Sequence, residues 1–192
     1  DHYLFHWVGL YGQGAEDRFA AATLRRVSQG GVNVRVAVGA DHAGFPLKEK
    51  LAKLLAEQGY AILDLGTHSE EAVDYPDYAS AVGSAIREGR ADRGMIVCGS
   101  GAGAAIAANK IRGVRAAVAH DTYTAHQSVE HDDANVIALG SRVVGEALAF
   151  EAASAFLAAQ FTGEERHVRR VGKIEALEAD WQGEGDRAHE VR

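Results

Sequence analysis

From residue 34 onward, short apolar runs alternate with segments in which apolar residues recur at helical spacing. Each run is nearly continuous, as expected of a strand buried on both faces, and the regular polar–apolar alternation of an open antiparallel sheet is absent. The runs predict five strands, at residues 34–39, 61–65, 94–98, 114–119 and 135–139. Because strands that alternate with helices form parallel sheets, the pattern predicts an α/β fold with a doubly wound five-stranded sheet.

The segment after the first predicted strand shows the helical pattern most clearly. Its leucines recur on one face, at positions 47, 51, 54 and 55, whereas Lys48 and the neighbouring charged residues fall outside that face. Pro46 suits the first turn of this helix and Gly59 its end. The same pattern predicts further helices at residues 77–88, 102–110, 122–130, 146–161 and 164–179.

Length and composition fit one domain of this kind. The chain has 192 residues, of which 47% are hydrophobic, and this is enough for a sizeable core. We expect the domain to cover residues 34–180. Residues 1–33 mix aromatic residues and glycines without a period and are expected to be a tag-like or disordered extension, while the polar segment 181–192 is expected to be a flexible tail.

Charge and cysteine content narrow the class of partner. A formal net charge of −7 argues against nucleic acid, because phosphate backbones are held by basic surfaces. No run approaches the roughly 20 apolar residues that span a membrane. A single cysteine cannot form an intrachain disulfide, as is typical of a protein in the reducing cytoplasm. Taken together, these features predict a cytoplasmic protein with neither nucleic-acid nor membrane partners.

The loops that follow the predicted strands carry most of the reactive side chains. In a doubly wound sheet, ligands bind beyond the carboxyl ends of the strands, where the strand order reverses. Asp41 and His42 follow the first predicted strand, Tyr75 lies after the second, Cys98 ends the third, and Arg142 follows the fifth. We expect Asp41 and His42 to face the Cys98 loop.

Cys98 is the only cysteine, and it opens a segment with glycines at positions 99, 101 and 103. Glycines permit a tight turn that brings backbone N–H groups close to an oxyanion, and such groups also favour a thiolate. Two interpretations are open. Cys98 is either a reactive thiol, with Ser100 as a second polar group, or a small buried residue at a strand end beside a loop hydroxyl.

A dinucleotide fingerprint overlaps the same segment. Gly99, Gly101 and Ala104 match the pattern G-x-G-x-x-A, and Asp121 follows about 20 residues further on. That fingerprint normally opens the first βαβ unit of a larger chain, whereas here it follows the third predicted strand. A small nucleotide-binding module is therefore the alternative from another functional class.

Other polar residues have a functional and a structural interpretation. Asp41 can serve as the cap of the next helix, and His131 as a solvated residue on a turn. Arg166 and Arg170 share a helix face and with Arg142 can hold a phosphate, or they can form an ordinary solvated basic face. The remaining histidines lack the spacing of metal ligands, so no metal is expected.

The order of these motifs resembles one family, ribose-5-phosphate isomerase B with its relatives the galactose-6-phosphate and allose-6-phosphate isomerases. The resemblance covers about residues 34–177. Its matching segments are GADHAG at 39–44, DYP at 74–76, CGSGAG at 98–103, IAANK at 106–110, HDDANV at 131–136, GSR at 140–142 and RH at 166–167.

The resemblance implies a Rossmann-like αβα sandwich that forms a homodimer or a dimer of dimers, with active sites built across the subunit interface. It implies interconversion of ribose 5-phosphate and ribulose 5-phosphate through an enediolate, without metal or organic cofactor. Isomerases of four- or six-carbon sugar phosphates are the alternative within this class. A catalytically silent protein of the same fold is a further one.

The resemblance also implies a role for individual residues. Cys98 is the base, Ser100 shuttles protons, and Asp41 and His131 assist ring opening. Backbone amides form the oxyanion hole, at Gly99, Gly101, Ala102 and Gly103. The implied substrate-binding residues are Tyr75 and Asp132 for the sugar and His42, Arg142, Arg166, His167 and Arg170 for the phosphate, some of them from the partner subunit.

Two positions distinguish this chain within the family. One branch uses a glutamate as base at the position of Ala104, so alanine there and Cys98 place the chain in the thiol branch. Many members have asparagine at position 132, and Asp132 therefore adds a negative charge near the sugar.

Overall fold

The computed structural model describes residues 34–189, with side chains as far as residue 179, and the chain from Val34 onward forms one compact unit. The expectation for residues 1–33 lies outside this part. The strands are β1 (Arg35–Ala40), β2 (Ala61–Asp64), β3 (Arg93–Cys98), β4 (Ala116–Val118) and β5 (Val136–Gly140). The helices are α2 (Phe45–Glu57), α3 (Tyr75–Arg87), α4 (Ala102–Ala108), α5 (Thr122–Asp132), α6 (Glu146–Ala158) and α7 (Glu165–His189).

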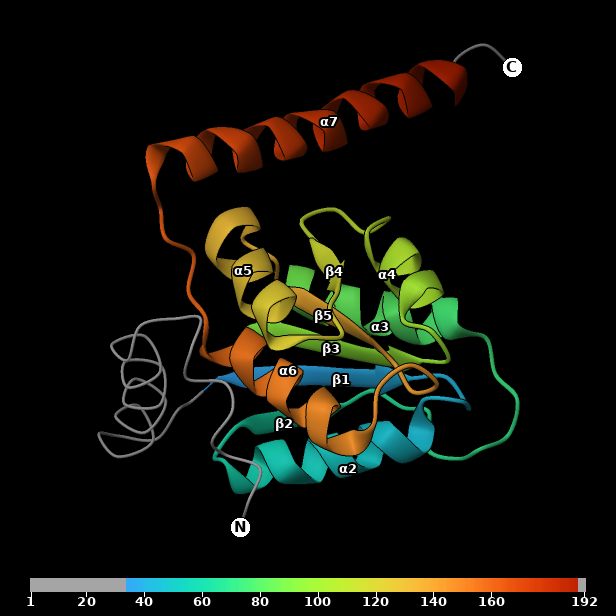
Figure 1. Ribbon diagram of the computed structural model, residues 1–192. Helices are drawn as coiled ribbons and strands as arrows, with labels where there is room; N and C mark the ends of the chain where they lie inside the picture. The colour runs from blue at the N-terminus through green and yellow to red at the C-terminus, as the bar shows by residue number, and fades with distance from the viewer. Residues whose placement is uncertain (1–33, 190–192) are drawn as a thin grey trace. The chain divides into compact units, whose positions relative to one another are not determined.

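The described strands form one parallel sheet in the order β2-β1-β3-β5-β4, which confirms the predicted five-stranded parallel sheet. The register places Cys98, the last residue of β3, level with Gly140, the last residue of β5. The strand order reverses between β1 and β3, so the loops after these two strands meet at the switch point. In Figure 1 the strands run from left to right and these loops lie at the right.

Helices cover both faces of the sheet, with α2, α5 and α6 on one side and α3 and α4 on the other (Figure 1). On the first face, Leu51, Leu55 and Phe156 are fully buried against the apolar side chains of β1, β3 and β5. On the second face, Val82 and Ala104 belong to a separate buried cluster. This arrangement is the predicted αβα sandwich.

Several element boundaries differ from the prediction, and α6 ends at Ala158 instead of residue 161. Strand β4 has three residues instead of six, because Val114 closes a turn on Ile111 (N–H to O, 3.0 Å) before the ladder begins. Helix α5 continues to Asp132, so His131 lies in its last turn and not in the loop that follows. Helix α7 continues to His189, so residues 181–189 are helical, beyond the helix end predicted at residue 179.

Lys48 is fully buried, which contradicts the prediction that it lies outside the buried face of α2. Its Nζ lies 2.7 Å from both carboxylate oxygens of Asp64 and 2.8 Å from Glu49, and it donates to the Thr67 carbonyl at 3.0 Å. A buried ammonium is tolerated only with such partners. Lys48 therefore ties the loop after β2 to α2.

Helix α7 passes over the edge strand β4 (Figure 1). Glu178 accepts hydrogen bonds from the Gly113 N–H at 3.1 and 3.3 Å. Ile174 and Leu177 line a cavity of about 580 Å³ together with residues next to β4. Although α7 is 25 residues long, neither it nor any other helix within the described residues is apolar enough to cross a membrane.

Candidate active site

The Cys98 thiol faces the glycine loop that follows β3. Its Sγ accepts a hydrogen bond from the Gly101 N–H at 3.1 Å. Gly101 has φ +81°, a left-handed conformation that favours glycine, and this turn directs its amide at the sulfur. Cys98 is 4% exposed and also contacts the buried cluster under α3 and α4, so the sulfur lies where the core meets the loop.

Residues that follow β5 hold this loop in place through backbone hydrogen bonds. The Ser141 N–H donates to the Cys98 carbonyl at 2.8 Å, and the Arg142 N–H donates to the Gly99 carbonyl at 3.1 Å. The Arg142 side chain lies over Gly99, because a Cβ at that glycine would be 3.7 Å from its Cδ. The predicted cation is thus next to the predicted oxyanion loop.

Asp41 lies beside Cys98 across the switch point, as the sequence predicts. Its N–H donates to the Val97 carbonyl at 3.2 Å, and its carboxylate accepts the Gly44 N–H at 2.8 Å. Asp41 is 8% exposed. His42 follows at the surface, and its Nδ1 lies 3.2 Å from the Val73 carbonyl oxygen, which connects this turn to the loop before α3.

Tyr75 and Ser100 complete the group at this edge of the sheet. Tyr75 begins α3 and is 40% exposed, and a Cβ at Gly103 would be only 2.8 Å from its ring. The Ser100 hydroxyl accepts a hydrogen bond from the Ala102 N–H at 3.3 Å. One chain therefore brings together Asp41, His42, Tyr75, Arg142 and the segment from Cys98 to Gly103.

A second group of predicted residues surrounds the end of α5 and the start of α7. The rings of His131 and His167 are in contact, with centroids 4.2 Å apart and planes tilted by 32°. Arg166 pairs with Glu164 at 2.8 Å, and Arg170 lies one turn further along α7. Asp132 is the last residue of α5 and is exposed.

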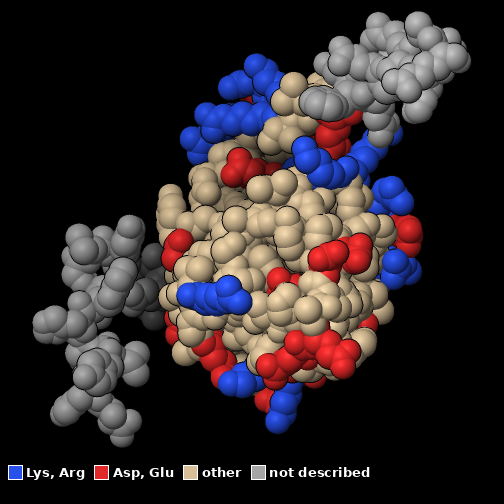
Figure 2. Space-filling model, turned by 90° about the vertical axis from the view of Figure 1, so that its right-hand side faces the viewer, with Lys and Arg blue, Asp and Glu red and all other residues tan. Residues whose placement is uncertain are grey.

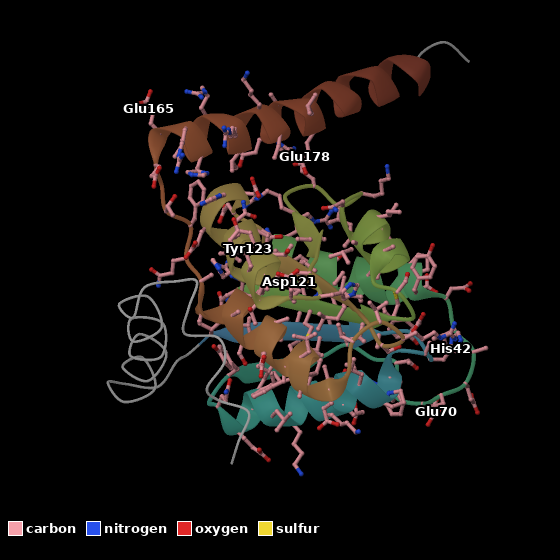
Figure 3. All side chains as sticks on the ribbon, in the orientation of Figure 1. His42, Glu70, Asp121, Tyr123, Glu165 and Glu178 are labelled. Carbon is pink, nitrogen blue, oxygen red and sulfur yellow. The ribbon has the colours of Figure 1, made fainter. Side chains whose placement is uncertain are left out.

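These two groups lie at opposite ends of the strands, the Cys98 group at the carboxyl ends and the His131 group near the amino end of β5. Helix α5 runs back from the carboxyl end of β4 to the amino end of β5, so His131 and Asp132 precede β5 whereas Cys98 is level with its last residue. The four residue steps from Val136 to Gly140 span about 13 Å. Figure 3 shows the same separation, with His42 at the right end of the domain and Glu165 at the left.

The placement of His167 does not suit the direct phosphate contact that the resemblance implies. Its side chain is 1% exposed, and its Nδ1 lies 3.1 Å from the His131 carbonyl oxygen, to which it can donate. Nε2 has no hydrogen-bond partner among the described residues. His167 instead supports the backbone and ring of His131.

Gln127 is a site neighbour that the sequence analysis missed. Its amide nitrogen lies 2.9 Å from Nδ1 of His131, one turn further along α5. This contact occupies Nδ1 and leaves Nε2 as the ring atom that can face a ligand. Glutamine four residues before histidine on a helix is a recognisable spacing, but it gains meaning only once the role of His131 is known.

Few charged side chains lie at the centre of the face that carries the Cys98 group (Figure 2). The face at the carboxyl ends of the strands is largely uncharged, with one basic patch left of its centre and acidic side chains to the right and below (Figure 2). Within the described residues, no three histidine, cysteine or acidic side chains gather as a metal site would require.

The comparisons with known proteins identify the family. The family model for ribose/galactose isomerases matches residues 36–174. The chain belongs to this family.

Individual members of the ribose/galactose isomerase family match most of the domain. Ribose-5-phosphate isomerase B of Escherichia coli (strain K12) is 47% identical over 144 residues, which are 75% of this chain and 96% of that protein. D-erythrulose-4-phosphate isomerase of Pectobacterium atrosepticum is 42% identical over 129 residues, 67% of this chain and 85% of the relative. These matches argue against the dinucleotide-binding alternative for the Gly99–Ala104 segment.

The fold also matches a solved structure of the family. Ribose-5-phosphate isomerase B of Clostridium thermocellum superposes with a TM-score of 0.75 at 47% identity, covering 77% of this chain and 99% of that one. The sheet and its helices are therefore those of the family.

Proposed function

We propose that the protein interconverts ribose 5-phosphate and ribulose 5-phosphate through an enediolate, with Cys98 as the base. The observation that carries this proposal is the Sγ of Cys98 beside the Gly101 N–H, in a loop flanked by Asp41 and Arg142. Family membership supports the reaction class.

The chemistry needs a base and a site for negative charge. The Cys98 thiolate removes the proton from carbon 2 of the open-chain aldose, the C2–H electron pair forms the C1–C2 double bond, and the aldehyde oxygen becomes the oxyanion. Amides of the segment from Gly99 to Gly103 stabilise that charge. Ser100 transfers the proton of the C2 hydroxyl to oxygen 1, and the thiol returns its proton to carbon 1.

Ring opening must precede this step when the aldose is cyclic. The anomeric hydroxyl has to lose a proton and the ring oxygen has to gain one. The carboxylate of Asp41 suits the first task, and His131, whose Nδ1 is in contact with Gln127, suits the second through its Nε2. Asp132 lies next to His131 and adds negative charge on the sugar side.

Phosphate binding falls to positively charged and hydrogen-bonding side chains from both groups. His42 and Arg142 lie at the edge that carries Cys98, while Arg166 and Arg170 project from the first turns of α7. Guanidinium groups bind phosphate oxygens with paired hydrogen bonds. Tyr75 lines the sugar pocket beside Gly103.

A second copy of the chain supplies the missing half of the site. Cys98 and His131 are separated by the length of β5, so one chain cannot place both on a small sugar phosphate. In a two-fold symmetric dimer, each subunit contributes both groups of residues. The His131 group of one subunit can then meet the partner's Cys98 group. We therefore propose a homodimer, or a dimer of dimers, with shared sites.

The proposal is tested by assaying ketose formation from ribose 5-phosphate. The wild type is expected to be active, and Cys98→Ala is expected to lose at least about a hundredfold in kcat, because no other base replaces the thiolate. Circular dichroism confirms that the variant is folded. A folded wild type that is inactive on every phosphorylated aldose overturns the proposal.

Carbon number is decided by comparing kcat/KM for four-, five- and six-carbon aldose phosphates. The relative that acts on erythrulose 4-phosphate makes the tetrose the first competitor to examine. We expect the pentose to be preferred. Since the proposed base is a free thiol, the proposal also places the protein in a reducing compartment, the cytoplasm.

A further inference from the structure

His120 lies two residues beyond β4, next to the N-cap of α5, and it is partly buried. Its Nε2 is 2.9 Å from the backbone nitrogen of Gly140. Because a backbone N–H can only donate, Nε2 is the acceptor.

This bond continues the ladder between β4 and β5 after β4 has ended. Every second residue of β5 turns its N–H toward β4, so that Val136 donates to the Arg115 carbonyl at 3.3 Å. The Ala119 N–H donates back to Ala138 at 3.3 Å. Gly140 is next in this alternation, and its acceptor is the imidazole of His120 in place of a backbone carbonyl.

Gly140 is in direct contact with the glycine loop. A Cβ on Gly140 would lie 2.7 Å from the carbonyl carbon and oxygen of Ser100. A Cβ on Gly101 would lie 3.1 Å from the Leu139 carbonyl carbon and 3.3 Å from the Gly140 nitrogen. The same Gly101 donates its N–H to the Cys98 sulfur. A shift of Gly140 therefore moves the amides that face the thiol.

We infer that His120 is a positioning residue for the Cys98–Gly101 loop. It acts through the Gly140 N–H and touches no reacting atom. This inference rests on the proposed isomerase function, because that function gives the loop amides their task. Those amides stabilise charge that appears only as the enediolate forms, so losing the imidazole acceptor lowers kcat more than it raises KM.

Paired variants separate the acceptor from the bulk of the ring. In His120→Gln, an amide oxygen at similar reach can still accept the Gly140 N–H. In His120→Leu, a side chain of comparable size offers no acceptor. The control is His68→Leu, which changes a histidine whose side chain is 73% exposed, on the loop after β2.

The expected result is a split between the two His120 variants. For His120→Leu, kcat on ribose 5-phosphate falls by about tenfold or more, while KM stays within about twofold, because a small displacement of loop donors suffices for such a loss. His120→Gln keeps kcat within about threefold of the wild type, and His68→Leu keeps both constants.

Two further measurements need no substrate. Hydrogen exchange of the Gly140 amide, followed by NMR, is expected to accelerate in His120→Leu and to stay slow in His120→Gln. The rate of Cys98 alkylation by iodoacetamide is expected to change in the leucine variant alone. If circular dichroism shows that His120→Leu is unfolded, His120→Asn, whose amide is too short to reach Gly140, replaces it.

Three outcomes overturn the inference. They are full kcat in folded His120→Leu, equal impairment of the glutamine and leucine variants, and unchanged exchange at Gly140. A wild type without activity on phosphorylated aldoses overturns the proposed function instead. In that case Gly140 exchange and Cys98 alkylation still decide whether His120 holds the loop.

Discussion

Gly44 occupies a position where two backbone segments meet. A Cβ there would lie 2.1 Å from the Val97 carbonyl oxygen, immediately before Cys98. Its φ of −87° is open to any residue, so space and not conformation requires glycine. The close approach lets Asp41 and Cys98 sit side by side at the switch point.

Gly44→Ala is therefore expected to lower the free energy of unfolding by about 1–3 kcal/mol, because the added methyl must push β3 away from the Asp41 turn. Isomerase activity is expected to fall with it. Urea denaturation measures the first effect and the ketose assay the second.

Gly145→Ala is the matched control for this prediction. Gly145 is also a helix N-cap, at α6, with φ −75° and no atom within 4 Å of an added Cβ. We expect a cost below about 1 kcal/mol, as is usual for such a cap change. Equal costs for the two variants contradict the argument from close approach.

Sequence analysis proposed candidate reactive residues but did not identify the residues that hold them in place. Cys98, Asp41 and Tyr75 follow predicted strands, and strand position alone makes them candidates. Lys48 and His120 gave no local signal, because their partners Asp64 and Gly140 lie 16 and 20 residues away along the chain. Which distant polar group a side chain meets depends on strand order, and periodicity does not report it.

At the scale of elements, α5 has a well-defined start that fixes the path from β4. Asp121 is its N-cap, and its carboxylate accepts the Thr124 N–H at 2.7 Å. Hydrogen bonds from the backbone and side chain of Thr124 lower the pKa of Asp121 below its ordinary value. The charged carboxylate is thus the form that stabilises the fold.

Asp121→Ala is expected to lower the free energy of unfolding by about 1 kcal/mol at neutral pH. Because the pKa is lower in the folded than in the unfolded chain, this stabilisation is complete above the unfolded value of about 3.9 and is lost as the pH falls through the folded value. The difference between wild type and variant, measured by urea denaturation at several pH values, should therefore shrink in acid.

Asp74→Ala provides the comparison for Asp121→Ala. Asp74 is the N-cap of α3, but its side chain makes no capping hydrogen bond. We expect a smaller loss of stability at neutral pH. A loss as large as that of Asp121→Ala, or one that persists unchanged in acid for Asp121→Ala, contradicts the assignment of the stabilisation to the capping bond.

The order of the elements was predicted more accurately than the residues at which they begin and end. The α/β alternation and all five strands were predicted, because buried parallel strands are short continuous apolar runs. The length of β4 was not, since Val114 belongs to the apolar run but closes a turn on Ile111 before the ladder begins. The end of α7 was also missed, because polar residues and glycines in its last turns gave no helical stripe.

At the scale of the whole molecule, the two halves of the proposed site lie at opposite ends of the strands. The Cys98 group lies at the carboxyl ends of the strands, and the His131 group lies at the amino end of β5. If the site is shared as proposed, neither group forms an active site until a second subunit supplies the other group.

Mixing two inactive variants tests this directly. Cys98→Ala and His131→Ala, unfolded together and refolded, should recover about a quarter of wild-type activity, since half of the dimers are mixed and each mixed dimer has one intact site of two. Ketose formation is compared before and after mixing. Sedimentation confirms that dimers form.

Cys98→Ala mixed with Asp41→Ala is the control, because both residues lie at the carboxyl ends of the strands in the same subunit. Every site in such a mixed dimer carries one defect, so activity is expected to stay near zero. Recovery in this control, or none in the first mixture, contradicts a site shared in the proposed way.

The sequence by itself determined the layer structure and singled out the glycine loop at Cys98 as the candidate reactive segment. Both follow from local order, since apolar runs define buried strands and three glycines beside a cysteine define a turn rich in amide donors. Only the tertiary structure decided that His131 lies a strand's length from Cys98, that His167 is buried, and that His120 completes the ladder at Gly140. Those relations depend on strand order and helix direction, which bring together residues far apart in the chain.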